Sequence, residues 1–189
     1  MIDLVFDLGG GILPASYPFA LWEALLSHVP DLALEKSVGV LPLRATVSFE
    51  GLLISKRTKL VLRLPLKIAP VAFTLSGLDL LPLHTGAMLL GKSRLRQILP
   101  FPTLHAQQVS GAADEMLFLE DIQAQLSELG IAGRIICGLR RTLSDTIKGY
   151  SLVIHDLKPE DALKLQYAGL GAYRQFGCGI FLPHKVISV

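Results

Sequence analysis

The sequence has only two cysteines and few charged residues. Cys137 and Cys178 do not form a CxxC pair, which excludes a framework of several disulfides and a four-cysteine zinc site. Charged residues make up 18% of the 189 residues, and 18 Lys and Arg against 16 Asp and Glu give a formal net charge of +2. This near balance excludes a uniformly basic surface, so any contact with nucleic acid must come from local patches.

Apolar residues are abundant instead, at 51% of the chain with a mean hydropathy of +0.50. This composition is that of a folded chain rather than a disordered one. The amino-terminal MIDLVFDLGG has no basic region before its apolar residues, so we expect no secretory signal. Residues 68–91 are long enough to span a bilayer, but Asp79 and several prolines and glycines interrupt them. We therefore expect a cytoplasmic protein with reduced thiols and no membrane association.

The first half of the chain alternates between strand-like and helix-like patterns. A strand at 2–6 ends at the glycines 9–11, and a helix at 18–29 begins with Pro18 after Ser16 as a possible N-cap. Residues 38–64 read as strands, with the polar cluster 55–58 as a hairpin turn between the last two. A short helix at 65–73 and strands at 78–83 and 87–90 follow. This is the β-α-β-β-α-β order of the ferredoxin-like fold.

The second half repeats this order after a predicted basic linker at 92–96. A strand at 104–110 precedes an amphipathic helix at 114–129, which ends at Gly130 and turns one face inward. We expect that face to consist of Met116, Leu119, Ile122, Leu126 and Leu129. Strands at 134–142 and 149–155, a helix at 159–167, a glycine-rich loop at 169–179 and a strand at 180–182 complete the half.

These patterns predict an α+β fold of two tandem ferredoxin-like (RRM-like) βαββαβ halves. The predicted domains are residues 1–91 and residues 98–189, the second of which carries the glycine-rich loop.

The glycine-rich loop, GLGAYRQFGCG, is the sharpest local feature of the sequence. Glycines permit positive φ and close approach of a ligand to the backbone, and successive exposed amides can bind a phosphate. Arg174 would supply charge, and Tyr173 or Phe176 a stacking face. The loop has no GKS or GKT ending and precedes a strand, which excludes the Walker and Rossmann motifs. A purely structural glycine hairpin is the alternative interpretation.

The spacing Gly-h-Gly-x5-Gly-h-Gly before the last strand resembles the signature loop of the endoribonucleases that process CRISPR repeat RNA. This family is a branch of the repeat-associated RNA-binding superfamily. Other segments that resemble it are IDLVF with GGGILP, FALWEAL, GVLPL, PFPTL and GLRRTL.

The resemblance implies cleavage of each CRISPR repeat without a metal or cofactor. The RNA 2′-hydroxyl attacks the adjacent phosphate and leaves a 2′,3′-cyclic phosphate and a 5′-hydroxyl. Such chemistry needs a base, an acid and a cation for the phosphorane charge.

Many relatives carry a histidine just after the first helix, and the corresponding residues 32–35 contain none here. His28 is the nearest substitute, in the last turn, where the helix dipole favours its protonated form. Tyr17 is a second catalytic candidate, although it lies about 16 Å from His28 along a continuous helix at 1.5 Å per residue. Lys36 or Ser27 would assist. Alternatively, His28 is a solvated helix-end residue and the chain binds RNA without efficient cutting.

The remaining histidines are weaker candidates. His84 and His105 lie in strand-like apolar surroundings and read as structural residues, and His155 begins a turn. His184 follows the last strand close to the glycine-rich loop and is a reserve candidate.

RNA binding is predicted for basic residues on the paired strands of the second half and for the glycine-rich loop. Strand alternation would place Arg134 and Arg140 on one face and Arg141 on the other. Two further basic groups are Lys92, Arg94 and Arg96, and Lys56, Arg57 and Lys59, the last of which we interpret as a solvated face. The complete predicted set of RNA-binding residues is Arg134, Arg140, Arg141, Lys148, Gly169, Gly171, Tyr173, Arg174, Gly177 and Gly179.

Three functions follow as hypotheses. The first is a repeat-RNA endoribonuclease whose partners are the repeat RNA, the guide product and, by resemblance, other subunits of an interference complex. The second is a repeat-RNA-binding subunit of such a complex with weak cleavage. The third is a generic ferredoxin-like module that binds a ligand or a protein.

Overall fold

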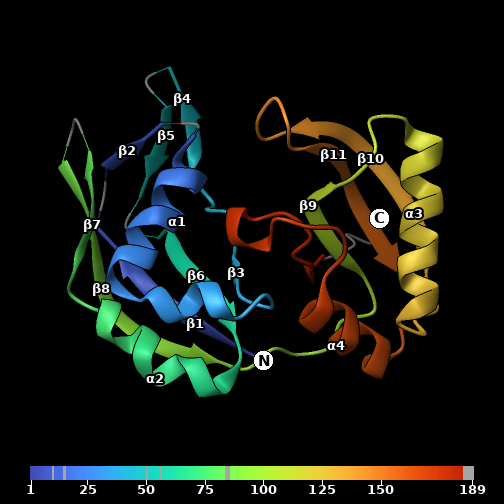
Figure 1. Ribbon diagram of the computed structural model, residues 1–189, viewed down its shortest axis with the longest axis horizontal. Helices are drawn as coiled ribbons and strands as arrows, with labels where there is room; N and C mark the ends of the chain where they lie inside the picture. Colours follow the sequence, from blue (N-terminus) through green and yellow to red (C-terminus); the bar gives the residue numbers. More distant parts are fainter. Residues whose placement is uncertain (10, 15, 50, 56, 84–85, 185–189) are drawn as a thin grey trace. The chain divides into compact units, whose positions relative to one another are not determined.

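A computed structural model describes the chain except for residues 10, 15, 50, 56, 84–85 and 185–189 (Figure 1). The chain divides into two compact units, Met1–Gln97 and Ile98–Val189, each with its own hydrophobic core. Lys56 and His84, which belong to the basic groups and histidines named above, lie outside the described residues. In the part of the chain that is described, no helix combines the length and apolarity needed to cross a membrane.

The first unit is built on an antiparallel sheet in the order β3-β6-β1-β8-β7. The strands are β1 (Ile2–Leu8), β3 (Gly39–Val40), β6 (Lys59–Leu64), β7 (Asp79–Leu83) and β8 (Gly86–Arg96). Alternation along β1 turns Leu4, Phe6 and Leu8 into the core and Asp3 and Asp7 to the other face. Without the edge strand β7, the sheet has the ferredoxin-like order in which the first strand lies between the third and the last.

Short helices pack on the core face of this sheet. The first is α1 (Tyr17–His28), which has Pro18 in its first turn as predicted and buries Leu21 and Leu25. Ser16 occupies the N-cap position as predicted, but its side chain makes no capping hydrogen bond within the described residues. The 3-10 helix η1 (Pro30–Leu34) follows. The predicted helix at 65–73 is a composite of η2 (Leu66–Ile68), α2 (Ala69–Ala72) and η3 (Phe73–Leu75).

A second, three-stranded sheet corrects the predicted hairpin at 55–58. β2 (Gly11–Leu13), β4 (Thr46–Ser48) and β5 (Gly51–Ile54) pair in the order β2-β5-β4, whereas β6 pairs with β1 and β3. The described residues of the polar cluster, Ser55, Arg57 and Thr58, instead bond to one another between β5 and β6. Thr58 Oγ1 accepts from the Ser55 amide at 3.2 Å and donates to the Arg44 carbonyl at 3.1 Å.

The predicted basic linker at 92–96 was also wrong, because these residues are the second half of β8. Arg96 lies opposite Asp3 and Arg94 opposite Val5 on β1, so both arginines share the face of the β1 aspartates. Arg94 pairs with Asp7 at 3.2 Å. Ion pairs with the aspartates of β1 therefore favour the inclusion of this basic stretch in the sheet.

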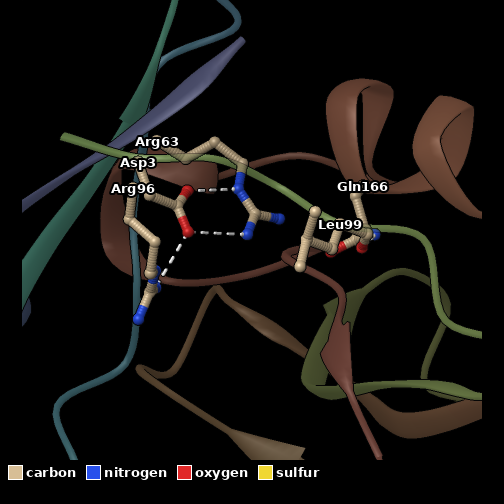
Figure 2. Close-up of polar contacts among 5 residues, drawn as sticks. All are labelled: Asp3, Arg63, Arg96, Leu99 and Gln166. Carbon is tan, nitrogen blue, oxygen red and sulfur yellow. Dashed lines mark hydrogen bonds and ion pairs between the residues drawn. The ribbon is translucent and has the colours of Figure 1, made fainter.

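A buried carboxylate joins the three central strands (Figure 2). Asp3 and Arg63 are only 2% and 1% exposed, and Arg63 Nε and Nη2 donate to Asp3 Oδ1 and Oδ2 at 2.8 and 3.2 Å. Arg96 Nη2 donates to Asp3 Oδ2 at 2.8 Å from the other side. One residue of β1 therefore holds a residue of β6 and a residue of β8.

The second unit has an antiparallel sheet in the order β10-β11-β9-β12. Its strands are β9 (Leu104–Ser110), β10 (Arg134–Thr142), β11 (Lys148–His155) and β12 (Leu182–Pro183), and its helices are α3 (Glu115–Glu128), α4 (Pro159–Ala168) and the 3-10 helix η4 (Arg174–Phe176). One face of the sheet packs on α3 and α4, as the predicted ferredoxin-like order requires. The segment before β9 is tied to α4 by Gln166 Nε2, which donates to the Leu99 carbonyl at 2.8 Å (Figure 2).

The predicted helix at 114–129 is confirmed, but its buried face differs from the prediction. Asp114 caps α3 by accepting from the amides of Met116 and Leu117, and Gly130 follows the helix at φ +62°. Phe118, Ile122 and Leu126 are buried, whereas Met116 is 73% exposed. The helix starts at the Asp114 cap, and Met116 lies in the first turn, away from the core.

A β-bulge in β10 reverses the expected alternation of its arginines. Cys137 lies opposite Leu152, but Arg140 lies opposite Tyr150, so β10 has one extra residue between them. Arg141 therefore shares the face of Arg134, and Arg140 points to the other. The predicted grouping of Arg134 with Arg140 was wrong because it assumed unbroken alternation, although Gly138 lies inside the bulged segment and a glycine within a strand is typical of a bulge.

We predict that Asp3→Ala lowers the free energy of unfolding of the first unit by about 3–5 kcal/mol, because it leaves a buried guanidinium without its carboxylate. Trp22, the single tryptophan, packs against the core of this unit, so its fluorescence in a urea titration reports the change.

Asp7→Ala is the matched control, because it removes an exposed β1 carboxylate that pairs with Lys59 and Arg94. Surface ion pairs contribute little, so this variant is expected to unfold close to wild type. Equal losses in the two variants would contradict the role assigned to Asp3.

Candidate functional site

The backbone of the glycine-rich loop, residues 169–179, adopts conformations that its sequence predicts. Gly169, Gly171, Gly177 and Gly179 all have positive φ, and so does Tyr173 at +65°. A Cβ on Gly179 would overlap the Leu170 carbonyl oxygen, and one on Gly169 would overlap the Arg174 guanidinium. Glycine is therefore required at the two ends of the loop by both backbone conformation and space.

Side chains from β9 and α3 hold this loop in place. Ser110 Oγ accepts from the Ala172 amide at 2.8 Å and donates to the Ala172 carbonyl at 3.0 Å. Gln125 Oε1 accepts from the Gly171 amide at 2.8 Å. Ser110 and Gln125 were not predicted from the sequence, because residues far away along the chain with common side chains give no local signal.

Most amides of the loop already donate hydrogen bonds within the protein. The amides of residues 169–172 and 176–179 all donate to other groups of the protein. The predicted cradle of exposed amides is therefore not formed by residues 169–172 and 176–179. The loop offers side chains rather than a continuous row of amides to a ligand.

Two predicted loop residues, Arg174 and Tyr173, have different environments. Arg174 is 7% exposed, and its Nη1 donates to the Ala168 carbonyl at 2.7 Å, so it holds the loop to the end of α4. We therefore interpret Arg174 as a structural residue rather than the surface charge that the sequence suggested. Tyr173 is 41% exposed, and its ring stacks on Phe176 with centroids 6.4 Å apart. Burial raises the pKa of the neighbouring Cys178 thiol to about 11, which leaves it protonated.

A pocket of about 490 Å³ opens beside the loop. The end of β9, helix α3, the β10–β11 connection and the glycine-rich loop each contribute to its wall. The lining residues used below are Ser110, Asp121, Gln125, Lys148, Gly171 and Tyr173. The structure thus brings together Lys148, Gly171 and Tyr173 from the predicted RNA-binding set.

The predicted basic group on β10 and β11 divides into two. Arg134 lies at the start of β10, where its Nε is 3.2 Å from Asp156 Oδ2. Arg140 and Arg141 are exposed at the other end of the strand, near Lys148. At about 3.3 Å per strand residue, the two ends are roughly 20 Å apart. Only the Arg140 and Arg141 end lies beside the connection that lines the pocket.

Two histidines meet on the sheet face opposite the helices. The rings of His105 on β9 and His184 lie 5.6 Å apart between centroids. Burial lowers the pKa of His105, and the charges of His184 and Arg141 lower it further. At neutral pH His105 is therefore uncharged. Within the described ranges, no three His, Cys, Asp or Glu side chains are grouped so that they could hold a metal ion.

Tyr17, a catalytic candidate from the sequence, is buried in the core of the first unit. Its hydroxyl accepts a hydrogen bond from the Leu43 amide at 3.1 Å, and burial raises its pKa. The hydroxyl is enclosed because the first turn of α1 packs against the core. The assignment of Tyr17 as a catalytic residue is therefore withdrawn.

His28 and Lys36 are both exposed, one at the last residue of α1 and the other just after η1. Ser27 is exposed too, but its hydroxyl donates to the Ala24 carbonyl at 2.8 Å. Between His28 and Lys36, η1 buries Leu32 and leaves Leu34 79% exposed. The surface that follows the first helix therefore presents the side chains of His28 and Lys36.

Each unit thus contains an antiparallel sheet in which four strands follow the ferredoxin-like order, and the second carries a constrained glycine-rich loop beside a polar pocket. These features define a tandem ferredoxin-like α+β protein. The family model described as Cas6 CRISPR matches residues 2–186. This chain belongs to the Cas6 family.

Individual relatives agree with this assignment. A CRISPR-associated endonuclease Cas6 of Myxococcus xanthus (strain DK1622) is 33% identical over 189 residues, which cover 96% of this chain and 81% of the relative. Among solved structures, the product of a Cas6-related gene from Pyrococcus furiosus superposes with a TM-score of 0.63 at 12% identity, covering 96% and 97% of the two chains. Thermus thermophilus Cse3, bound to an RNA that represents a pre-cleavage complex, has a TM-score of 0.55 at 13% identity and covers 96% and 97%. The two structures agree with this chain in fold.

We predict that Gly179→Ala destabilises the second unit more than Gly130→Ala does. Both residues have φ near +65°, where a non-glycine residue costs about 1–2 kcal/mol. A Cβ at Gly130 meets no atom within 4 Å, whereas one at Gly179 overlaps the Leu170 carbonyl. Thermal unfolding followed by circular dichroism, with Trp22 fluorescence to identify the first unit, measures the difference. Identical melting temperatures would show that the loop backbone is not as constrained as described.

Proposed function

We propose that this chain is an endoribonuclease that binds CRISPR repeat RNA and cleaves it to release guide RNA. The observation that carries the proposal is the 33% identity to a CRISPR-associated endonuclease Cas6 over 96% of the chain. A structural neighbour bound to RNA supports RNA as the partner. Other subunits of an interference complex are proposed partners of the product.

The proposed reaction is an internal transesterification of the RNA. A 2′-oxygen attacks the adjacent phosphorus as its proton passes to a base, the bond from phosphorus to the 5′-oxygen breaks, and an acid protonates the leaving oxygen. The products are a 2′,3′-cyclic phosphate and a 5′-hydroxyl. Because the nucleophile belongs to the substrate, the protein has to supply proton transfer and positive charge, and we propose that it does so without a metal ion.

We assign the proton transfer to His28 and the stabilising charge to Lys36. His28 ends α1, where the helix dipole favours a cation. Imidazole changes its charge near neutral pH, so one side chain can accept the proton of the 2′-hydroxyl and donate a proton to the leaving 5′-oxygen. Lys36 lies just beyond η1 and is exposed.

We assign RNA binding to Arg140, Arg141, Lys148 and Tyr173. The three cations lie at one end of the β10–β11 hairpin, where they suit phosphates and 2′-hydroxyls on the RNA surface. Tyr173 offers a ring for stacking. Gly169, Gly171, Gly177 and Gly179 shape the loop, whereas Arg134, bound to Asp156, is a weaker candidate.

One observation favours a second candidate function, repeat-RNA binding with little cleavage. The segment after α1, which holds a histidine in the relatives that the sequence resembles, is η1 here, and it presents Ala33 and Leu34 at the surface. Proton transfer must then come from His28 at the end of the helix. The two functions differ in cleavage rate and not in affinity for RNA.

We predict that His28→Ala lowers the rate of repeat-RNA cleavage by about 10²-fold or more, because it removes the proposed proton-transfer group, and leaves RNA affinity unchanged. The measurement is single-turnover cleavage of labelled repeat RNA in excess EDTA, with affinity measured separately by filter binding.

Glu23→Ala is the control, since it truncates an exposed side chain of the same helix. A 2′-deoxy nucleotide at the cut site is expected to abolish cleavage by the wild type. An unchanged rate in His28→Ala would remove the assignment of His28. Loss of cleavage in EDTA would overturn the metal-independent mechanism, and binding without cleavage would favour the second function.

We predict that replacing Arg140 and Arg141 together by alanine weakens repeat-RNA binding and flattens its dependence on salt. Each arginine that no longer neutralises a phosphate reduces the slope of log affinity against log salt by roughly 0.7–0.9. Filter binding at several salt concentrations measures this slope, with Lys164→Ala on α4 as a control for removal of a cation. A slope equal to wild type would show that neither arginine binds phosphate.

A further inference from the structure

The pocket beside the glycine-rich loop has features that the proposed cleavage does not use. Its volume of about 490 Å³ lies in the range of small-ligand sites and exceeds that of one nucleobase. Its wall carries a carboxylate, Asp121, although an RNA backbone would be repelled by negative charge. A carboxylate at this position needs a ligand with hydrogen-bond donors.

The loop itself fixes the orientation of that carboxylate. Gln125 Oε1 accepts from the Gly171 amide, so Gln125 Nε2 is directed to Asp121 and donates to its Oδ2 at 2.8 Å. Each carboxylate oxygen accepts two hydrogen bonds, so Asp121 keeps acceptor capacity for a ligand. The chain Gly171–Gln125–Asp121 thus holds an acceptor at a defined place in the pocket.

Two other lining residues suit the remaining parts of a nucleotide. Tyr173 is half-exposed, and its stacking on Phe176 sets the plane of its ring. Unstacked bases bind such aromatic faces. Lys148 supplies an ammonium group for the attached phosphate.

We propose that this pocket binds one unpaired guanine of the RNA, with its Watson–Crick edge on Asp121 and its ring on Tyr173. The inference rests on the proposed function for the identity of the polymer. Guanine presents two adjacent donors, N1–H and N2–H₂, which match the two oxygens of a carboxylate. Adenine and cytosine present a ring nitrogen acceptor beside their amino donor, and uracil presents one donor between two carbonyls. Guanine is therefore the base that a fixed carboxylate favours.

The test uses the full chain and labelled oligouridine decamers that carry one central guanosine, inosine, adenosine or cytidine. Wild type is expected to bind the guanosine decamer roughly tenfold more tightly than the inosine decamer, which lacks the 2-amino group. The Asp121→Asn side chain still accepts from Gln125 but offers a base one donor and one acceptor, an arrangement that suits adenine and cytosine. This variant is expected to lose the preference for guanosine and to bind the adenosine and cytidine decamers better than wild type does.

Glu120→Gln is the matched control, because it removes one exposed negative charge from the same helix outside the pocket lining. This variant is expected to retain the guanosine preference, because any change in affinity from the lost charge is the same for all four decamers. Equal affinity of wild type for the four decamers, or an unchanged preference in Asp121→Asn, would overturn the inference.

Two outcomes separate this inference from the proposed function. Cleavage of repeat RNA together with equal binding of the decamers would leave the proposed function and remove the guanine pocket. Guanosine preference in a chain that neither binds nor cuts repeat RNA would retain the guanine pocket and remove the proposed function. Displacement of the guanosine decamer by an equimolar amount of free guanosine 5′-monophosphate would assign the pocket to free nucleotides and overturn its assignment to RNA.

Discussion

The attachment of the glycine-rich loop to Ser110 and Gln125 is the interaction on which the candidate site of the second unit depends. Glycines allow the loop its positive φ angles, but they also make many other conformations accessible, so glycine alone cannot select one. Ser110 and Gln125 make that selection by binding the Gly171 and Ala172 backbone. The same hydrogen bonds orient Asp121 and place Tyr173 at the pocket. The shape and chemical character of the site therefore come from β9 and α3 as much as from the loop.

The first unit uses its charges differently. Asp3 takes Arg63 and Arg96 as partners, and Asp7 takes Lys59 and Arg94, so four of the cations in this unit neutralise two residues of one strand. A count of basic residues in the sequence consequently overestimates what is available to an RNA. His28 and Lys36 lie outside this network, at the end of α1 and just beyond η1. The proposed catalytic groups are thus separate from the charges that hold the sheet together.

The order of elements could be predicted from the sequence because hydrophobic period, prolines and glycines are local signals. The helix 17–28, the helix before Gly130 and the positive φ of the loop follow from them. Pairing between distant strands could not be predicted from such local signals. For this reason β5 was expected to pair with β6, whereas it pairs with β2. The bulge in β10 and the entry of residues 92–96 into β8 depend on partners across the sheet. For the site, residue types near the loop were foreseeable, whereas the burial of Tyr17 and Arg174 and the hydrogen bonds of Gln125 were not.

The absence of space around Gly169 and Gly179 has a consequence for how this protein can vary over generations. Every amino-acid change that a glycine codon can undergo introduces a Cβ, and at these two positions the neighbouring backbone or guanidinium already fills its place. Stepwise drift through single mutations is therefore blocked at both ends of the loop. The residues that line the pocket around the loop, such as those at 121 and 148, are free of this restriction, because their side chains can be exchanged without moving the main chain.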